Sequence, residues 1–190
     1  MEIRGYLMEI RSYLVEVPFG GLRKNTYLCN MKLMRVLSRP FRMLRIVCFV
    51  WKARRPSTMH DMPAVVDTFW IKSGYDALTF FGTILTQSQN EADSMNGRMT
   101  ALKNHEMIHL RQAQSTGDSW WRFYRLDLRF WLQGWRQRKH FPNAGYRLNP
   151  FEMEAYEHMH DLSYLNRCKN GATGWKRYAR MTVEERWFLK

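Results

Sequence analysis

The sequence His105-Glu106-Met107-Ile108-His109 stands at the centre of a stretch with helical periodicity. Residues four apart in an α-helix lie on the same face, so both imidazoles can reach a single cation. Glu106 follows the first histidine directly and lies beside that cation. The five residues therefore predict a helix that supplies two metal ligands and one further carboxylate to the same place.

Zinc suits this arrangement, because neutral imidazole is one of its favoured ligands and a catalytic zinc site uses three protein ligands and one water. We therefore expect one Zn²⁺ on His105 and His109. The metal lowers the pKa of its water, and Glu106 is then expected to act as general base. The alternative interpretation is an ordinary polar helix face.

A second helix that carries carboxylates is expected about forty residues later, beginning at Asn149-Pro150. Asn149 suits the N-cap and Pro150 the first helical position. At ~100° per residue, Glu152 lies about 60° from the centre of the expected buried stripe, whereas Glu154 lies farther out and Glu157 points away. The stripe consists of Phe151, Ala155, Met159 and Leu162. Glu152 is thus the carboxylate best placed to face a metal, although at N3 it could instead complete a capping box.

The histidine motif followed by the segment Phe151-Glu152-Met153-Glu154-Ala155 resembles the gluzincin metallopeptidases, over roughly residues 62–166. It is similar to the minimal forms, to the branch of CAAX prenyl endopeptidases and heat-shock membrane proteases, and to short bacterial metallopeptidase-like proteins. The resemblance implies Glu152 as the third zinc ligand, a zincin-like minimal core and hydrolysis of a peptide or protein substrate.

Tyr156 stands where the larger branch of the resembled family has Asp. An Asp there would orient a metal ligand. Tyr156 could instead donate a hydrogen bond to the oxyanion that forms during hydrolysis, or it could be a half-buried packing residue. His158 and His160 are weaker candidates for stabilising the transition state, and surface positions are equally consistent with their pattern.

The rest of the pattern predicts a mainly helical α+β domain with a small antiparallel strand pair ahead of the histidine motif. The strands are expected at Val65–Ile71 and Leu78–Thr86, with a turn at Ser73-Gly74. Helices are expected at about Glu91–Gln114, from Trp120 to about Arg138, from Asn149 onward, and near Val183–Leu189. The edge of the second strand could bind an extended substrate, as the resembled family does.

The helix from Trp120 carries an aromatic stripe interleaved with arginines. Packing of the stripe on the other helices, docking at a membrane interface and stacking on nucleic acid are all consistent with it. The stripe consists of Trp120, Tyr124, Leu128, Trp131 and Trp135.

The chain has 190 residues and a net charge of +13, concentrated at the N-terminus: residues 1–60 hold 12 Lys and Arg against Glu2, Glu9 and Glu16. We expect a basic extension over residues 1–60, a core over 61–168 and a basic tail over 169–190. The extension could contact an anionic membrane peripherally, and no specific nucleic acid is expected.

Cys29, Cys48 and Cys168 are an odd number at wide spacings, which favours a reducing compartment. The longest apolar run, Met43–Trp51, is less than half the ~20 residues that span a bilayer. A cytoplasmic location, with peripheral contact at the inner membrane face, is therefore expected.

Two rival functions fit the same sequence. One is a basic, aromatic-rich binding domain on a membrane surface or nucleic acid, with zinc structural or absent. The other is a pseudo-enzyme with an intact metal site and no peptidase activity.

Overall fold

The computed structural model describes residues 44, 46–67, 71 and 75–189. The chain divides into two units, Met1–Cys48 and Phe49–Lys190. The described residues of the first unit, 44 and 46–48, are helical. Most of the basic extension predicted for residues 1–60 lies outside the described residues, and the fold below is that of the second unit.

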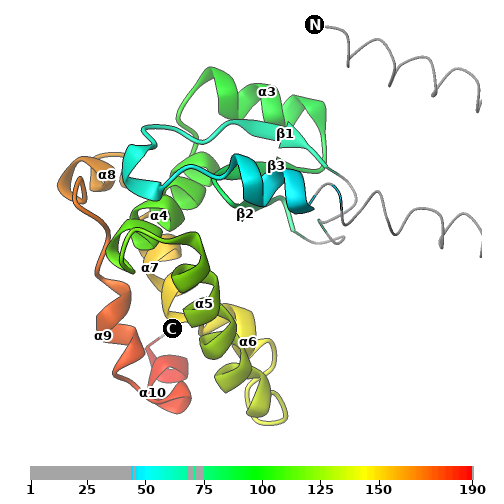
Figure 1. Ribbon diagram of the computed structural model, residues 1–190. Helices are drawn as coiled ribbons and strands as arrows, with labels where there is room; N and C mark the ends of the chain where they lie inside the picture. The colour runs from blue at the N-terminus through cyan, green and yellow to red at the C-terminus, as the bar shows by residue number, and fades with distance from the viewer. Residues whose placement is uncertain (1–43, 45, 68–70, 72–74, 190) are drawn as a thin grey trace, which may run out of the picture. The chain divides into compact units, whose positions relative to one another are not determined.

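The second unit combines a small sheet with many helices, which confirms the predicted mainly helical α+β class. Its strands are β1 (Ala64–Val66), β2 (Ala77–Phe80) and β3 (Thr83–Thr86). A short 3₁₀ helix precedes them at Pro56–Thr58. The helices are α3 (Gln89–Gly97), α4 (Ala101–Ser115), α5 (Trp120–Arg136), α6 (Ala144–Arg147), α7 (Pro150–His158), α8 (Tyr164–Arg167), α9 (Trp175–Ala179) and α10 (Val183–Phe188). In Figure 1, α4 and α7 lie between the sheet and the group formed by α5, α6, α9 and α10.

The sheet is mixed, in the order β1-β3-β2, with β1 parallel and β2 antiparallel to β3. The prediction of one strand over Leu78–Thr86 was wrong, because the chain reverses at Phe81-Gly82 and forms the β2–β3 hairpin. Both turn residues have positive φ, 47° and 82°, as a tight two-residue hairpin turn requires. The φ of 82° at position 82 is one that glycine adopts without strain, which favours glycine there.

The single helix predicted over Glu91–Gln114 is in fact two helices. The chain is extended at Arg98, directly after Gly97. Thr100 then caps α4, and its hydroxyl accepts a hydrogen bond of 3.0 Å from the backbone N–H of Lys103. Hydrophobic periodicity runs through this break unchanged, which explains the error, and Met99 in the break is 41% exposed.

Helix α4 runs through the core, where Ile108 and Leu110 are fully buried, and it holds both ends of α7. Asn104 Nδ2 donates to the carbonyls of residues 158, 159 and 161 at the C-terminal end of α7. Gln112 Nε2 donates to the carbonyl of Phe151 at its N-terminal end, 2.9 Å away. Because these backbone carbonyls are fixed by side chains of α4, the relative register of the two helices is fixed as well.

Helix α5 packs on the core through a different face from the one that the aromatic stripe indicated. Trp120, Phe123, Phe130 and Gly134 are buried. Leu128, Trp131 and Trp135 of the predicted stripe are 56%, 41% and 43% exposed. Of the three interpretations of the stripe, packing of all its members on the core does not hold, because the buried face is rotated toward Phe123 and Phe130.

Segments on both sides of the predicted core pack against it. Trp120 Nε1 donates to the carbonyl of Arg54 at 2.9 Å, and the backbone N–H of Ala172 donates to the carbonyl of Arg111 at 2.9 Å. Trp175 of α9 is 8% exposed and belongs to the main hydrophobic cluster. The compact unit thus extends beyond residues 61–168 at both ends. Among the described residues, no helix has the length and apolar character needed to cross a membrane.

Candidate metal centre

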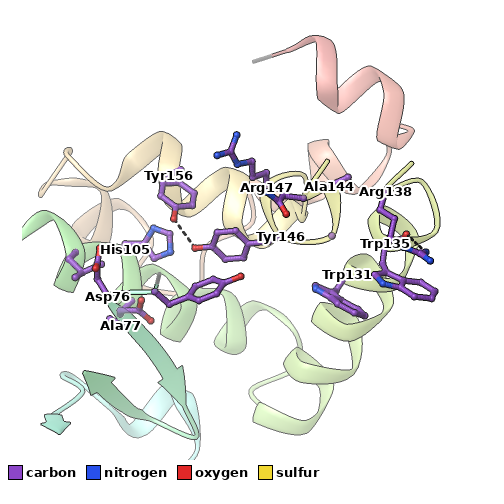
Figure 2. Close-up of a pocket in the computed structure, with 15 residues that line it drawn as sticks. Asp76, Ala77, His105, Trp131, Trp135, Arg138, Ala144, Tyr146, Arg147 and Tyr156 are labelled. Atoms are coloured by element: carbon purple, nitrogen blue, oxygen red, sulfur yellow. Dashed lines mark hydrogen bonds between the residues drawn. The ribbon is translucent and has the colours of Figure 1, made fainter. Parts of the chain in front are cut away.

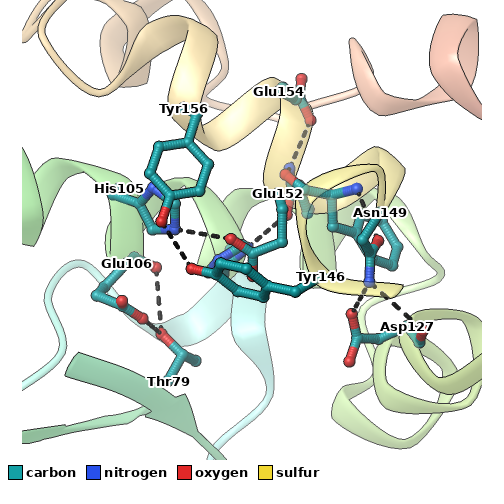
Figure 3. A network of polar contacts seen from close by, with 12 residues as sticks. Thr79, His105, Glu106, Asp127, Tyr146, Asn149, Glu152, Glu154 and Tyr156 are labelled. Atoms are coloured by element: carbon teal, nitrogen blue, oxygen red, sulfur yellow. Dashed lines mark hydrogen bonds and ion pairs between the residues drawn. The ribbon is translucent and has the colours of Figure 1, made fainter. Parts of the chain in front are cut away.

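Three side chains from two helices converge: His105 and His109 of α4, and Glu152 of α7. Figure 3 shows Glu152 directed toward His105. His105 Nε2 lies 3.3 Å from Glu152 Oε2, and His109 Nε2 lies 3.5 Å from Glu152 Oε1. A tetrahedral ion with bonds of ~2.0–2.1 Å separates its ligand atoms by about 3.3–3.4 Å. The two observed separations are close to this range but end on different oxygens of Glu152. One ligand atom from each of the three side chains lies within 4.8 Å of the other two, so the set is compact enough to hold one cation.

Glu152 is the carboxylate that the helical geometry singled out, and the structure turns it toward the imidazoles. The capping-box alternative does not form, since Asn149 caps α7 alone: its Oδ1 accepts from the backbone N–H of Phe151 at 3.1 Å. In the predicted buried stripe of this helix, Phe151 and Ala155 are fully buried. Leu162 is 51% exposed, because α7 ends before it.

The electrostatics of this cluster favour a positive charge between the three side chains. Burial alone would lower the pKa of His109, but the carboxylate of Glu152 outweighs burial and raises it to about 10. Burial alone would raise the pKa of Glu152, but the two histidines outweigh it and lower the pKa to about 2. In the described part of the chain, the buried Oε2 of Glu152 has no hydrogen-bond donor. A cation held by these three side chains would compete with a proton on His109, because a metal ligand must be deprotonated.

The ring of His109 is held by the side-chain amide of Gln112, which is itself bound to the carboxylate of Glu154. Its Nδ1 lies 2.8 Å from Gln112 Oε1, which fixes Nδ1 as the donor and leaves Nε2 to face Glu152. Gln112 Nε2 in turn donates to Glu154 Oε2 at 2.7 Å. Glu154 also accepts from Tyr164 Oη and from the backbone N–H of Gly174, both at 2.6 Å. The prediction that Glu154 lies farther out was wrong, since it is fully buried.

Glu106 lies beside the cluster without belonging to it. It is 4% exposed, and its Oε2 accepts a hydrogen bond of 2.6 Å from Thr79 Oγ1 on strand β2. Thr79 is held through its backbone, because its carbonyl accepts from Tyr124 Oη at 3.1 Å. Sequence reasoning missed Thr79, because β3 and α3 separate β2 from α4 in the chain and only tertiary packing brings Thr79 to Glu106.

Tyr156 borders the centre together with a tyrosine that the sequence did not single out. Its ring lies 4.6 Å from that of His105, and its Oη lies 2.7 Å from Tyr146 Oη. Burial and the charge of Glu152 raise the pKa of both tyrosines, so both stay protonated at neutral pH. Tyr146 belongs to α6, a short helix that is not among those expected from the sequence.

Asp127 of α5 supports the start of α7. Its Oδ1 accepts from Asn149 Nδ2 at 2.7 Å, which ties the N-cap of α7 to α5. Burial and the negative charge of Glu152 raise the pKa of Asp127 to about 6. A carboxylate with a raised pKa thus lies on α5, next to the N-cap of the helix that carries Glu152.

The remaining histidine candidates lie away from the cluster. The ring of His158 stacks on Tyr164 at 3.8 Å, and its Nε2 lies 3.4 Å from Glu157. His160 is exposed beyond the end of α7, and so are His60 and His140 in their loops. None of the four is brought to the metal cluster.

A cleft of about 550 Å³ opens onto His105 and Glu106 (Figure 2). One wall is the edge of the sheet at residues 75–77, and the opposite wall is formed by the end of α5 and by α6. Trp131 and Trp135 line it from α5, Arg138 lines it just after the end of that helix, and Tyr146 and Tyr156 also belong to its lining. The cleft thus brings the sheet, α5 and α6 together around His105 and Glu106.

No family model, curated protein or solved structure matches this chain.

Proposed function

We propose that this protein is a zinc-dependent peptidase that hydrolyses peptide bonds in peptide or protein substrates, with His105, His109 and Glu152 as ligands and Glu106 as general base. The observation that carries the proposal is a set of three candidate ligands within 4.8 Å of one another beside a cleft, flanked by a buried carboxylate that is not part of the set. A structural zinc site has four protein ligands, whereas a catalytic site keeps one position for water. The described residues supply three.

Zinc held there would act as a Lewis acid that lowers the pKa of water toward about 7 and polarises a carbonyl. Thr79 fixes one oxygen of Glu106, and the other oxygen takes the proton of the attacking water and passes it to the leaving amine. Tyr156 and Tyr146 are neutral donors at the cleft wall, placed to stabilise negative charge on the carbonyl oxygen. Ala77, the first residue of the edge strand β2, lines the cleft, and an edge strand there suits the binding of an extended backbone.

A cytoplasmic location at the inner membrane face belongs to the same proposal. It is supported by Cys48 and Cys168, which are free thiols. Reduced cysteines are typical of that compartment.

The test compares the wild type with Glu106→Gln and His109→Ala, with His140→Ala as a control for removing an exposed histidine. After zinc loading and gel filtration, we expect about one zinc per chain in the wild type, Glu106→Gln and His140→Ala, and little in His109→Ala. On a diverse peptide library, Glu106→Gln should lower turnover by about 10²–10⁴-fold while it keeps its metal.

Two results would contradict the proposal. If Glu106→Gln retains turnover, Glu106 is not the general base. A wild type that holds stoichiometric zinc yet cleaves nothing in the library indicates instead a metal site without peptidase activity.

A further inference from the structure

The side of α5 that faces away from the core divides lengthwise into an apolar half and an arginine half. At about 100° per residue, the two sets fall on adjoining sectors of the helix. The apolar half consists of Trp121, Leu128, Trp131, Leu132 and Trp135, each between 37% and 64% exposed. The arginine half consists of Arg122, Arg125, Arg129 and Arg136, all exposed.

A shallow groove of about 360 Å³ runs along the border of the two halves. Leu128 and Leu132 line it from one side, and Arg125, Arg129 and Arg136 line it from the other. A ligand in this groove meets aliphatic carbon and guanidinium groups together. The chemistry that satisfies both is an acyl chain that ends in a phosphate-bearing headgroup.

The charge of this face excludes several other occupants. Asp127 is the single acidic residue of α5, and it faces Asn149 rather than the exposed side. A second copy of the same face would oppose arginine to arginine, and the basic segment of residues 1–60 carries charge of the same sign. The partner must therefore be anionic.

Nucleic acid is anionic as well, but it fits the apolar half poorly. Bases bind by stacking on planar rings, and Leu128 and Leu132 offer none in the middle of the row of tryptophans. Tryptophan and leucine flanked by arginine are instead the composition of helices that lie in a membrane interface. We propose that this exposed face of α5 docks on an anionic lipid bilayer, independently of the proposed catalysis.

Docking of this face has a consequence for the cleft. Trp131 and Trp135 belong to the apolar half of α5 and also line the cleft that leads to His105. A bilayer that contacts the apolar half therefore lies beside one wall of the cleft, and chains close to the membrane surface gain access to it.

The test measures binding of the full-length chain to vesicles of phosphatidylcholine alone and with about 30% phosphatidylserine, by flotation. Arg125→Glu/Arg129→Glu should weaken binding to the anionic vesicles at least about tenfold, because each basic residue near the surface contributes about 1 kcal/mol. The matched control is Arg98→Glu/Lys169→Glu, which makes the same change of charge at exposed positions outside α5. It should change binding by less than about threefold.

A second double variant distinguishes insertion of the apolar half into the bilayer from adsorption through charge alone. Leu128→Ser/Leu132→Ser keeps all charges and should weaken binding about tenfold, with less quenching of tryptophan fluorescence by brominated acyl chains. Thermal unfolding of each variant checks that the fold is retained. Equal losses in the α5 charge variant and its control would overturn the proposal. So would tighter binding to an oligonucleotide than to vesicles, with the same dependence on Arg125 and Arg129.

Discussion

Helix α7 carries two carboxylates, two residues apart, in different surroundings: Glu154 is fully buried, and Glu152 is partly buried beside two imidazoles. Glu154 accepts hydrogen bonds from Gln112, Tyr164 and Gly174, so both of its oxygens are engaged. Glu152 faces two imidazoles and keeps an oxygen with no donor among the described residues. The difference teaches that a buried carboxylate can be structural or ligating, and that the count of its satisfied acceptors separates the two roles.

The sharpest test of this comparison exchanges each carboxylate for its amide. Glu152→Gln should lower zinc affinity by at least about 100-fold, since a ligand matters more than an outer partner, whose loss costs 10–100-fold. Glu154→Gln should instead lower the free energy of unfolding by about 3 kcal/mol, because an amide N–H₂ then opposes buried donors. Zinc titration and urea unfolding of the metal-free proteins measure the two effects. If both variants lose mainly stability, the distinction between the two carboxylates is wrong.

Gln112 is hydrogen-bonded to both His109 and Glu154. A substitution there should therefore lower both zinc affinity and stability, each by less than the carboxylate substitutions do. Gln112→Leu removes the acceptor for His109 Nδ1 and one donor to Glu154. We expect zinc affinity to fall by about 10-fold and the protein to lose about 1–2 kcal/mol of stability. Gln114→Leu, in the same helix and bonded only near the surface, serves as the control. An unchanged affinity in Gln112→Leu would show that His109 needs no support from behind.

Asp127 gives the smallest effect, which appears as a dependence on pH. Its folded pKa of about 6 exceeds the unfolded value of about 3.9, so the folded protein holds the proton more tightly. Below pH 4, Asp127 is protonated in both the folded and the unfolded protein, so burying it carries no cost from a charged carboxylate. Stability then falls as pH rises toward 6, and the full cost remains above that pH.

Asp127→Asn should remove this cost while Asn149 keeps an oxygen acceptor. Relative to the wild type, the variant should gain about 1–2 kcal/mol between pH 4.5 and pH 7, because access of water reduces the roughly 3 kcal/mol that two pKa units represent. Urea unfolding with chelator present measures the gain. A difference that stays constant over this range would show that Asp127 titrates normally.

The same comparison explains which parts of the centre the sequence could predict. His105, Glu106 and His109 follow from local spacing on one helix, and Glu152 follows from helical geometry with a family resemblance. Both predictions rest on the helical periodicity of the sequence, which places these residues on definite faces of their helices. The class of fold was predictable for the same reason.

The partners that support the centre could not be predicted, because they depend on tertiary packing. Glu154 looked exposed by helical phase, since nothing in the local pattern shows that α8 and α9 cover that side of α7. Thr79 and Tyr146 reach the site from a hairpin and a short helix whose turns had been assigned differently. The break between α3 and α4 was likewise invisible to periodicity, because a cap at Thr100 leaves the hydrophobic phase unchanged.

X-ray absorption spectroscopy of the zinc-loaded full-length protein tests the central claim most directly. The account predicts one zinc with four nitrogen or oxygen neighbours at about 2.0–2.1 Å and the multiple-scattering pattern of two imidazoles. Sulfur neighbours at about 2.3 Å would place the metal on cysteines instead, and a spectrum without imidazole would contradict the convergence of His105, His109 and Glu152 on one ion.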